Sequence, residues 1–127
     1  MKRIVTALIV VLTICVMLSG CSKSGKPKDM DEETYEAGKR AVEIVQDFLD
    51  AKITVQEAYD KLGIIHDRLD GLEFDGKNQS IAKSKNLSIE AKITSLSVFL
   101  LNHKISNGSL KYISENLKEL KDYLGLK

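Results

Sequence analysis

The sequence contains no tryptophan, and its two cysteines, Cys15 and Cys21, both lie near the N-terminus. Because no thiol follows Cys21, the rest of the chain can form neither a disulfide nor a thiolate metal site. An excess of charge of one sign is also missing, since 19 Lys and Arg residues stand against 18 Asp and Glu residues. Nucleic-acid-binding domains carry a basic face or stripe, so this balance argues against a nucleic-acid partner.

The usual signatures of an active site are missing as well. No Ser-His-Asp order, glycine-rich phosphate loop, paired-histidine motif or cysteine nucleophile with meaningful spacing is present. His66 and Asp70 are four residues apart, so one helix face can present both to a metal, but a site needs three or four ligands. The other histidine, His103, ends an apolar helical line and is expected to pack or cap. We therefore predict no catalytic residue, no metal, no cofactor and no enzymatic activity.

The N-terminal segment combines the features of a secretory signal. Lys2 and Arg3 form a basic start, residues 4–18 are apolar except for Thr6 and Thr13, and small residues follow. The apolar run is shorter than the roughly 20 residues of a membrane-spanning helix. Its length therefore favours a cleaved signal peptide over a transmembrane anchor.

The signal ends in Leu18-Ser19-Gly20-Cys21, which resembles the lipobox of bacterial lipoproteins. The resemblance implies an S-diacylglyceryl group on Cys21, cleavage between Gly20 and Cys21, and optional N-acylation of the new amine, for example with palmitate. Two acyl chains give a stable anchor, whereas one alone binds only marginally. The resemblance thus implies a protein held by membrane lipid at Cys21, on the extracytoplasmic face of the cell membrane. The rest of the chain carries no comparable family motif.

Three regions are expected: residues 1–20 as the lipoprotein signal peptide, residues 21–31 as the lipidated cysteine and a flexible tether, and residues 32–127 as a helical bundle domain. Residues 22–30 contain the only proline and, apart from Met30, no large apolar residue, as in flexible linkers. Removal of the signal peptide would take away two of the 19 basic groups and none of the 18 acidic groups. The mature protein would then carry a formal charge of −1.

Four segments of the domain have apolar residues at the three- and four-residue steps of an amphipathic helix. They run from about Glu32 to Ala51, Val55 to Asp70, Ser80 to His103 and Ser109 to Leu124. The polar start of the third leaves two alternatives, a start nearer Leu87 or a three-helix fold in which residues 81–86 are broken. Because short connections favour antiparallel neighbours, the expected fold is all-α: a small up-and-down four-helix bundle made of two helical hairpins.

Local signals mark several helix ends. Thr54 and Glu57 have the spacing of a capping box, in which each side chain bonds to the backbone of the other residue. Gly71 and Gly125 are expected to end their helices in the left-handed conformation.

Residues 48–54 resemble residues 100–106 at an offset of 52. One interpretation is a duplicated helical hairpin, and the other is convergence, because short turns between antiparallel helices favour similar residues. In both, Ile53 and Ile105 are expected to tuck under a turn, each followed by a hydroxyl residue near the start of the next helix.

The leading functional hypothesis is a non-enzymatic envelope lipoprotein that binds an envelope protein or a wall component through an exposed helical face. Tyr59 and Tyr112 either mark such a face or serve in packing. One alternative is a surface lipoprotein of the phage superinfection-exclusion type, because some of these are lipid-anchored helical hairpins. A second is a small-ligand carrier or an enzyme, which would need a pocket with convergent polar groups. A third is that the signal peptide supplies a secreted pheromone.

Overall fold

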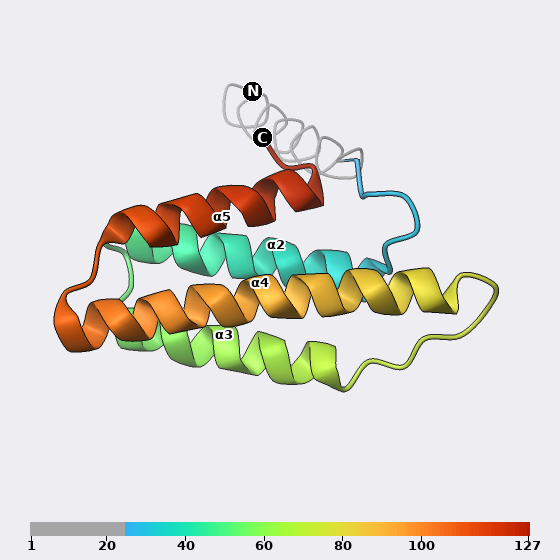
Figure 1. Cartoon of the computed structure of the whole chain (residues 1–127), viewed down its shortest axis with the longest axis horizontal. Helices are drawn as coiled ribbons and strands as arrows, with labels where there is room; N and C mark the ends of the chain where they lie inside the picture. The colour runs from blue at the N-terminus through green and yellow to red at the C-terminus, as the bar shows by residue number, and fades with distance from the viewer. Residues whose placement is uncertain (1–24) are drawn as a thin grey trace, which may run out of the picture.

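A computed structural model describes residues 25–127, which form four α-helices in an up-and-down bundle (Figure 1). The predicted all-α class and the four-helix architecture are confirmed. The helices are α2 (Glu32–Leu49), α3 (Val55–Asp70), α4 (Gln79–Ser106) and α5 (Leu110–Leu124). The predicted signal peptide and Cys21 lie outside the described residues.

Each helix packs antiparallel to the next one along the chain, as the short connections predict (Figure 1). Helix α3 packs most extensively on α4, while α2 contacts α3, α5 and, across the centre of the bundle, α4. The two hairpins, α2–α3 and α4–α5, therefore share one core. The diagonal contact between α2 and α4 places these two parallel helices at its middle.

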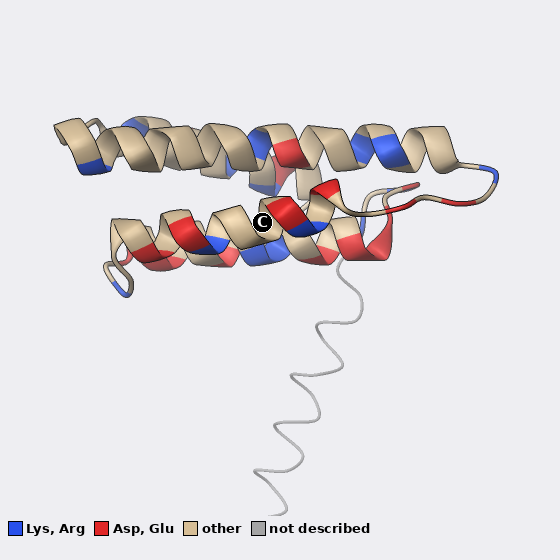
Figure 2. Ribbon diagram, turned by 90° about the horizontal axis from the view of Figure 1, so that it is seen from below, with Lys and Arg blue, Asp and Glu red and all other residues tan. Residues whose placement is uncertain are grey.

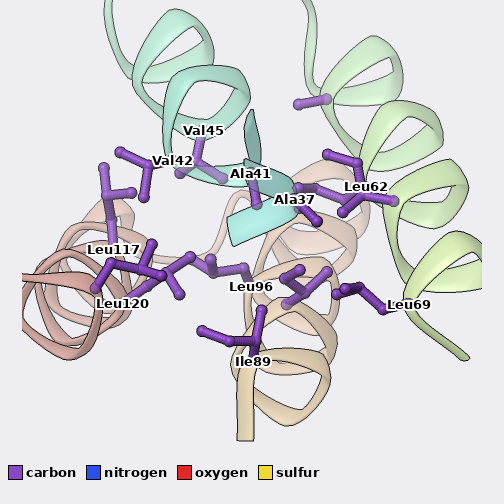
Figure 3. Close-up of a cluster of buried hydrophobic side chains, with 14 of the residues drawn as sticks. Ala37, Ala41, Val42, Val45, Leu62, Leu69, Ile89, Leu96, Leu117 and Leu120 are labelled. Carbon is purple, nitrogen blue, oxygen red and sulfur yellow. The ribbon is translucent and has the colours of Figure 1, made fainter. Parts of the chain in front are cut away.

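The core consists of the apolar lines that the helical period predicts. In Figure 3, Leu62 and Leu69 of α3, Ile89 and Leu96 of α4, and Leu120 of α5 all point into one cluster. The largest of the side chains that are less than 2% exposed are Leu62, Leu69, Ile89, Ile93, Leu96, Leu100, Ile113, Leu120, Leu124, Val45 and Thr34. Burial of one such aliphatic side chain is worth about 1.5–3 kcal/mol, which makes these lines the main source of stability.

Small residues on α2 permit the close approach of its neighbours. Ala37, Gly38 and Ala41 are buried on this helix. A Cβ atom at Gly38 would stand only 2.9 Å from Cδ2 of Leu124. The glycine therefore gives the last turn of α5 room to pack against α2.

The helix ends follow their local signals, with two exceptions. The capping box is formed, and Gly125 adopts a left-handed conformation with φ of 70°. Gly71 instead has φ of −83°, so the prediction for this glycine is wrong. Helix α2 ends at Leu49 rather than near Ala51, because Ala51 itself takes the left-handed conformation, with φ of 59°, and turns the chain towards α3.

The capping box makes one end of α3 sensitive to pH. The backbone N–H of Thr54 donates to the Glu57 carboxylate over 2.7 Å, and the Glu57 N–H donates to the Thr54 hydroxyl over 3.1 Å. The backbone bond and then the side chain of Thr54 lower the pKa of Glu57 below its ordinary value of 4.5. A carboxyl with a lowered pKa in the folded state stabilises the fold above its ordinary pKa, and this contribution is lost as the pH falls through the lowered value.

We therefore expect Glu57→Gln to be less stable than the wild type near neutral pH, and the difference to shrink as the pH falls well below 4.5. Urea unfolding of both chains at a series of pH values measures this difference. A gap that stays constant or widens on acidification would contradict the role of the Glu57 carboxylate.

The third helix is longer than its polar start suggested. Helix α4 runs without interruption from Gln79 to Ser106, so both alternatives, a start near Leu87 and a three-helix fold, are wrong. The reason lies in Asn86, a polar residue that is only 4% exposed. Its side chain bonds to α2 and α3, so the polar stretch takes part in the packing of the bundle.

The resemblance between the two halves of the chain extends to the burial of α2 and α4, but it fails at the second corner. At an offset of 52, Thr34, Ala37 and Ala41 of α2 correspond to Asn86, Ile89 and Ile93 of α4, and all six are buried. The second corner differs from the first. Ile53 packs against the core, but Ile105 is 75% exposed, so the prediction that it tucks under the turn is wrong.

Three extra residues explain this difference between the corners. The helix caps Thr54 and Ser109 are 55 positions apart rather than 52. Helix α4 therefore continues through Ser106, the counterpart of Thr54, and α5 begins one short turn later. The continued helix carries Ile105 on its outer side, away from the corner.

Candidate functional site

The residues just before α2 belong to the folded domain. Met30, which the sequence placed in the flexible tether, is 3% exposed and part of the core. Asp31 caps α2 through a 2.9 Å bond from the Glu33 N–H, and Asn78 Nδ2 donates to Asp29 over 3.3 Å. Any flexible tether from Cys21 is therefore shorter than predicted. Gly20 and Cys21 themselves lie outside the described residues.

The histidines occupy separate places. His66 Nδ1 lies 3.9 Å from an Asp67 carboxylate oxygen, on the side of α3. Within residues 25–127, no group of three or more histidine, cysteine or acidic side chains is arranged to hold a metal ion. His103 packs, which is one of the two roles expected for it: its ring and that of Phe48 lie edge to face with their centroids 5.7 Å apart. Its Nδ1 lies 2.7 Å from the carbonyl oxygen of Gly108, in the connection after α4.

Tyr59 and Tyr112, the tyrosines that could mark a binding face, are both exposed. Tyr59 of α3 is 37% exposed. Tyr112 of α5 is 54% exposed, and its ring stacks on Phe99 of α4 at a centroid distance of 5.7 Å. Tyr112 therefore packs with one ring face and remains open to solvent with the rest.

A groove of about 590 Å³ runs between α2 and α3. Glu36, Arg40, Glu43 and Arg68 line it together with the exposed Ile64. Acidic and basic groups alternate along its wall, so no single charge dominates. This mixed lining does not select a ligand of either sign.

The outer side of α4 carries an exposed line of side chains that sequence reasoning did not single out as a site. Six residues spaced by four, three, four, three and four positions form a line along it, and all six are exposed. They are Leu87, Ala91, Thr94, Val98, Leu101 and Ile105. We call this line the outer seam. It lies opposite the buried line through Ile89, Ile93, Leu96 and Leu100, because the two lines are offset by two residues, which is about 200° around an α-helix.

Charge is sparse along the middle of the outer seam. Between Ile93 and His103, α4 contains no Lys, Arg, Asp or Glu. Figure 2 shows α4 along the upper edge with most of its length uncharged. The two helices below it carry both acidic and basic residues along their length. Lys92, one of the few charged residues, turns towards α5, where it lies 3.8 Å from Glu119 and 5.6 Å from the centre of the Tyr123 ring.

A buried polar cluster sets the position of α4 against α2 and α3. The Thr34 hydroxyl donates to Asn86 Oδ1 over 3.0 Å, while Asn86 Nδ2 donates to the Leu69 carbonyl and to Glu90 Oε1 over 3.1 and 2.9 Å. No buried side-chain polar atom among the described residues lacks a partner. The cluster fixes which side of α4 faces the core, because a rotation of the helix would leave these groups unpaired.

We expect Asn86→Leu to lower the free energy of unfolding by about 1–3 kcal/mol, because it leaves the buried Thr34 hydroxyl without its partner. The double variant Thr34→Val with Asn86→Leu should recover much of this loss, since an apolar pair replaces both polar groups. Urea unfolding of the two single variants and the double variant measures their coupling. Losses that simply add would contradict a direct energetic link between the two residues.

Comparison with family models, with curated proteins and with solved structures found no match for the chain. Within residues 25–127, no helix is long and apolar enough to cross a membrane. The features available for a functional argument are therefore the lipobox-like sequence and the surface of the bundle.

Proposed function

We propose that this protein is a membrane-anchored envelope lipoprotein, held by lipid at Cys21 on the extracytoplasmic face of the cell membrane, whose helical bundle is a non-enzymatic protein-interaction module. The resemblance of Leu18-Ser19-Gly20-Cys21 to a lipobox supports the location. The exposed outer seam of α4 is the observation that supports a role in protein interaction.

The outer seam differs from scattered exposed apolar residues because its side chains are aligned along one side of a single helix. Single exposed apolar side chains are common on soluble proteins, but contiguous apolar patches mark binding sites. Leu87, Val98 and Ile105 are 54%, 53% and 75% exposed and share one line. A helix that is apolar on two opposite sides is normally buried on both, so a partner on the outer seam completes the burial of α4.

Crosslinking on intact cells tests this proposal. We expect an amine-reactive, membrane-impermeant crosslinker to join the wild-type full-length chain to a protein partner in a defined product. The double variant Val98→Asp with Ile105→Asp should lose that product, because two buried carboxylates would oppose association. Detection uses immunoblotting of the full-length chain.

Ile64→Asp is the matched control, because Ile64 is 70% exposed on α3, comparable to Ile105 on α4, and lies away from the outer seam. This variant should retain the crosslinked product. Equal loss in both variants, or no defined product with the wild-type chain, would contradict a role of the outer seam in binding.

A further inference from the structure

We infer that the partner of the outer seam is a second copy of this chain, and that the two α4 helices pack antiparallel about a two-fold axis at Ser95 and Ser97. This inference deepens the proposed function by naming the partner at the same surface. It rests on the spacing of the seam, on its side-chain sizes and on two charges beside it.

The spacing of the outer seam is that of a coiled-coil contact. Alternating steps of three and four residues keep a stripe of side chains facing a partner helix over many turns. The seam maintains this alternation from Leu87 to Ile105, a length of about 27 Å at 1.5 Å per residue. A partner of matching shape is therefore another long helix with the same repeat, and α4 of a second copy has it.

The side-chain sizes fit an antiparallel arrangement. When the two-fold axis lies midway between Ser95 and Ser97, three kinds of layer form, each occurring twice by symmetry. Their residues pair as Leu87 with Ile105, Ala91 with Leu101, and Thr94 with Val98. The small Ala91 side chain then receives the large Leu101 side chain, as close packing requires. A parallel pair in register would instead set Ala91 against Ala91 and leave a gap.

The charges beside the seam fit the same arrangement. In this alignment Glu90 of one copy lies opposite Lys104 of the other, so the interface contains this pair twice. Neither residue forms an ion pair within residues 25–127: Glu90 accepts from Asn86, and Lys104 donates to the uncharged Gln56 side chain. The other flanking positions are Ser88, Ser95, Ser97 and Asn102. These uncharged residues impose no charge repulsion on two approaching helices.

The symmetry of the pair is compatible with anchoring of both copies to one membrane. The two-fold axis is perpendicular to both α4 helices. If this axis is normal to the membrane, equivalent atoms of the two copies lie at the same height above the membrane surface. Both tethers can therefore reach the same membrane surface. Tethering also raises the effective concentration of each copy near the other, which favours association through a single helix pair.

Site-specific thiol crosslinking of the full-length chain in its membrane tests the alignment. Residues 22–127 contain no cysteine, so a single Ser97→Cys substitution introduces a defined site. A short bis-maleimide should convert this variant to a covalent dimer. Ser88→Cys should not dimerise alone, because the two Ser88 positions are about 24 Å apart along the antiparallel helices. Ser88→Cys co-expressed with Asn102→Cys should again give a dimer.

The wild-type chain treated in parallel reports any product formed through Cys15 or Cys21. Ser88→Cys alone crosslinking as strongly as Ser97→Cys would indicate a parallel pair and overturn the inference. Crosslinking of Ser97→Cys to a different protein alone would also overturn it, while the proposed function would stand. No crosslinking of any kind, together with unchanged behaviour of the Val98→Asp and Ile105→Asp double variant, would refute both.

A charge exchange gives a second measurement. Lys104→Glu should weaken dimerisation about fivefold, because it replaces two attractive pairs at the interface with two repulsive ones. The double variant Glu90→Lys with Lys104→Glu should restore it, because each pair regains opposite charges. Circular dichroism of both variants checks that the bundle is intact, since Glu90 also bonds to the buried Asn86. Failure of the folded double variant to recover would contradict the Glu90–Lys104 pairing.

Discussion

Replacement of Cys21 with serine is expected to remove the protein from the membrane or to leave it as an uncut precursor. Attachment of a diacylglyceryl group requires a nucleophilic thiol, which serine does not supply. Without the lipid, two acyl chains are lost, and a stable anchor requires two membrane-binding signals. The expected effect is a nearly complete loss of the lipid-bearing form of the chain.

Detergent phase partitioning and mass spectrometry measure this change. The wild-type chain should enter the detergent phase with its first 20 residues removed and a lipid mass on Cys21. Cys15→Ser is the matched control, because Cys15 lies in the segment that is removed, and it should behave as the wild type does. A wild-type protein that is processed and yet wholly soluble would contradict the lipoprotein proposal.

Ile93→Ala is expected to lower the free energy of unfolding by about 2–5 kcal/mol. Ile93 is fully buried in the middle of α4, and loss of its side chain removes buried apolar surface and leaves a cavity among closely packed neighbours. Val98→Ala on the same helix should change stability by no more than about 0.5 kcal/mol in the monomer, since Val98 is 53% exposed.

Chemical denaturation at protein concentrations low enough to keep the chain monomeric measures both variants. The two substitutions shorten apolar side chains five residues apart, so their comparison separates the buried side of α4 from its outer seam. A loss at Val98 as large as that at Ile93 would mean that the outer seam is packed within the monomer. That result would leave no free surface for a partner.

Local chemistry explains why much of the fold could be predicted. The capping box of Thr54 and Glu57, the hydroxyl cap at Ser109 and the left-handed Gly125 depend on residues near one another in sequence. The apolar steps of α3 and α5 likewise need no knowledge of the rest of the chain. These features correctly placed the bounds of both helices to within one residue.

The errors at the start of α4 and at Ile105 occurred where distant residues decide the outcome. The polar start of α4 looked like a weak helix, but Asn86 finds partners on Thr34 and Leu69, which lie in two other helices. The exposure of Ile105 likewise depends on where α5 begins, which shifts the second corner by three residues relative to the first. Neither relation is visible in a local window.

The outer seam likewise depends partly on local sequence and partly on contacts between distant residues. The sequence by itself determined that the chain forms four helices, and it carried both lines of α4 at equivalent helical spacing. Only the tertiary structure decided which line is buried, because the choice depends on how α4 packs against the small residues of α2 and how Asn86 bonds to α2 and α3. Those contacts turn Ile89, Ile93 and Leu96 into the core and leave the line from Leu87 to Ile105 facing solvent.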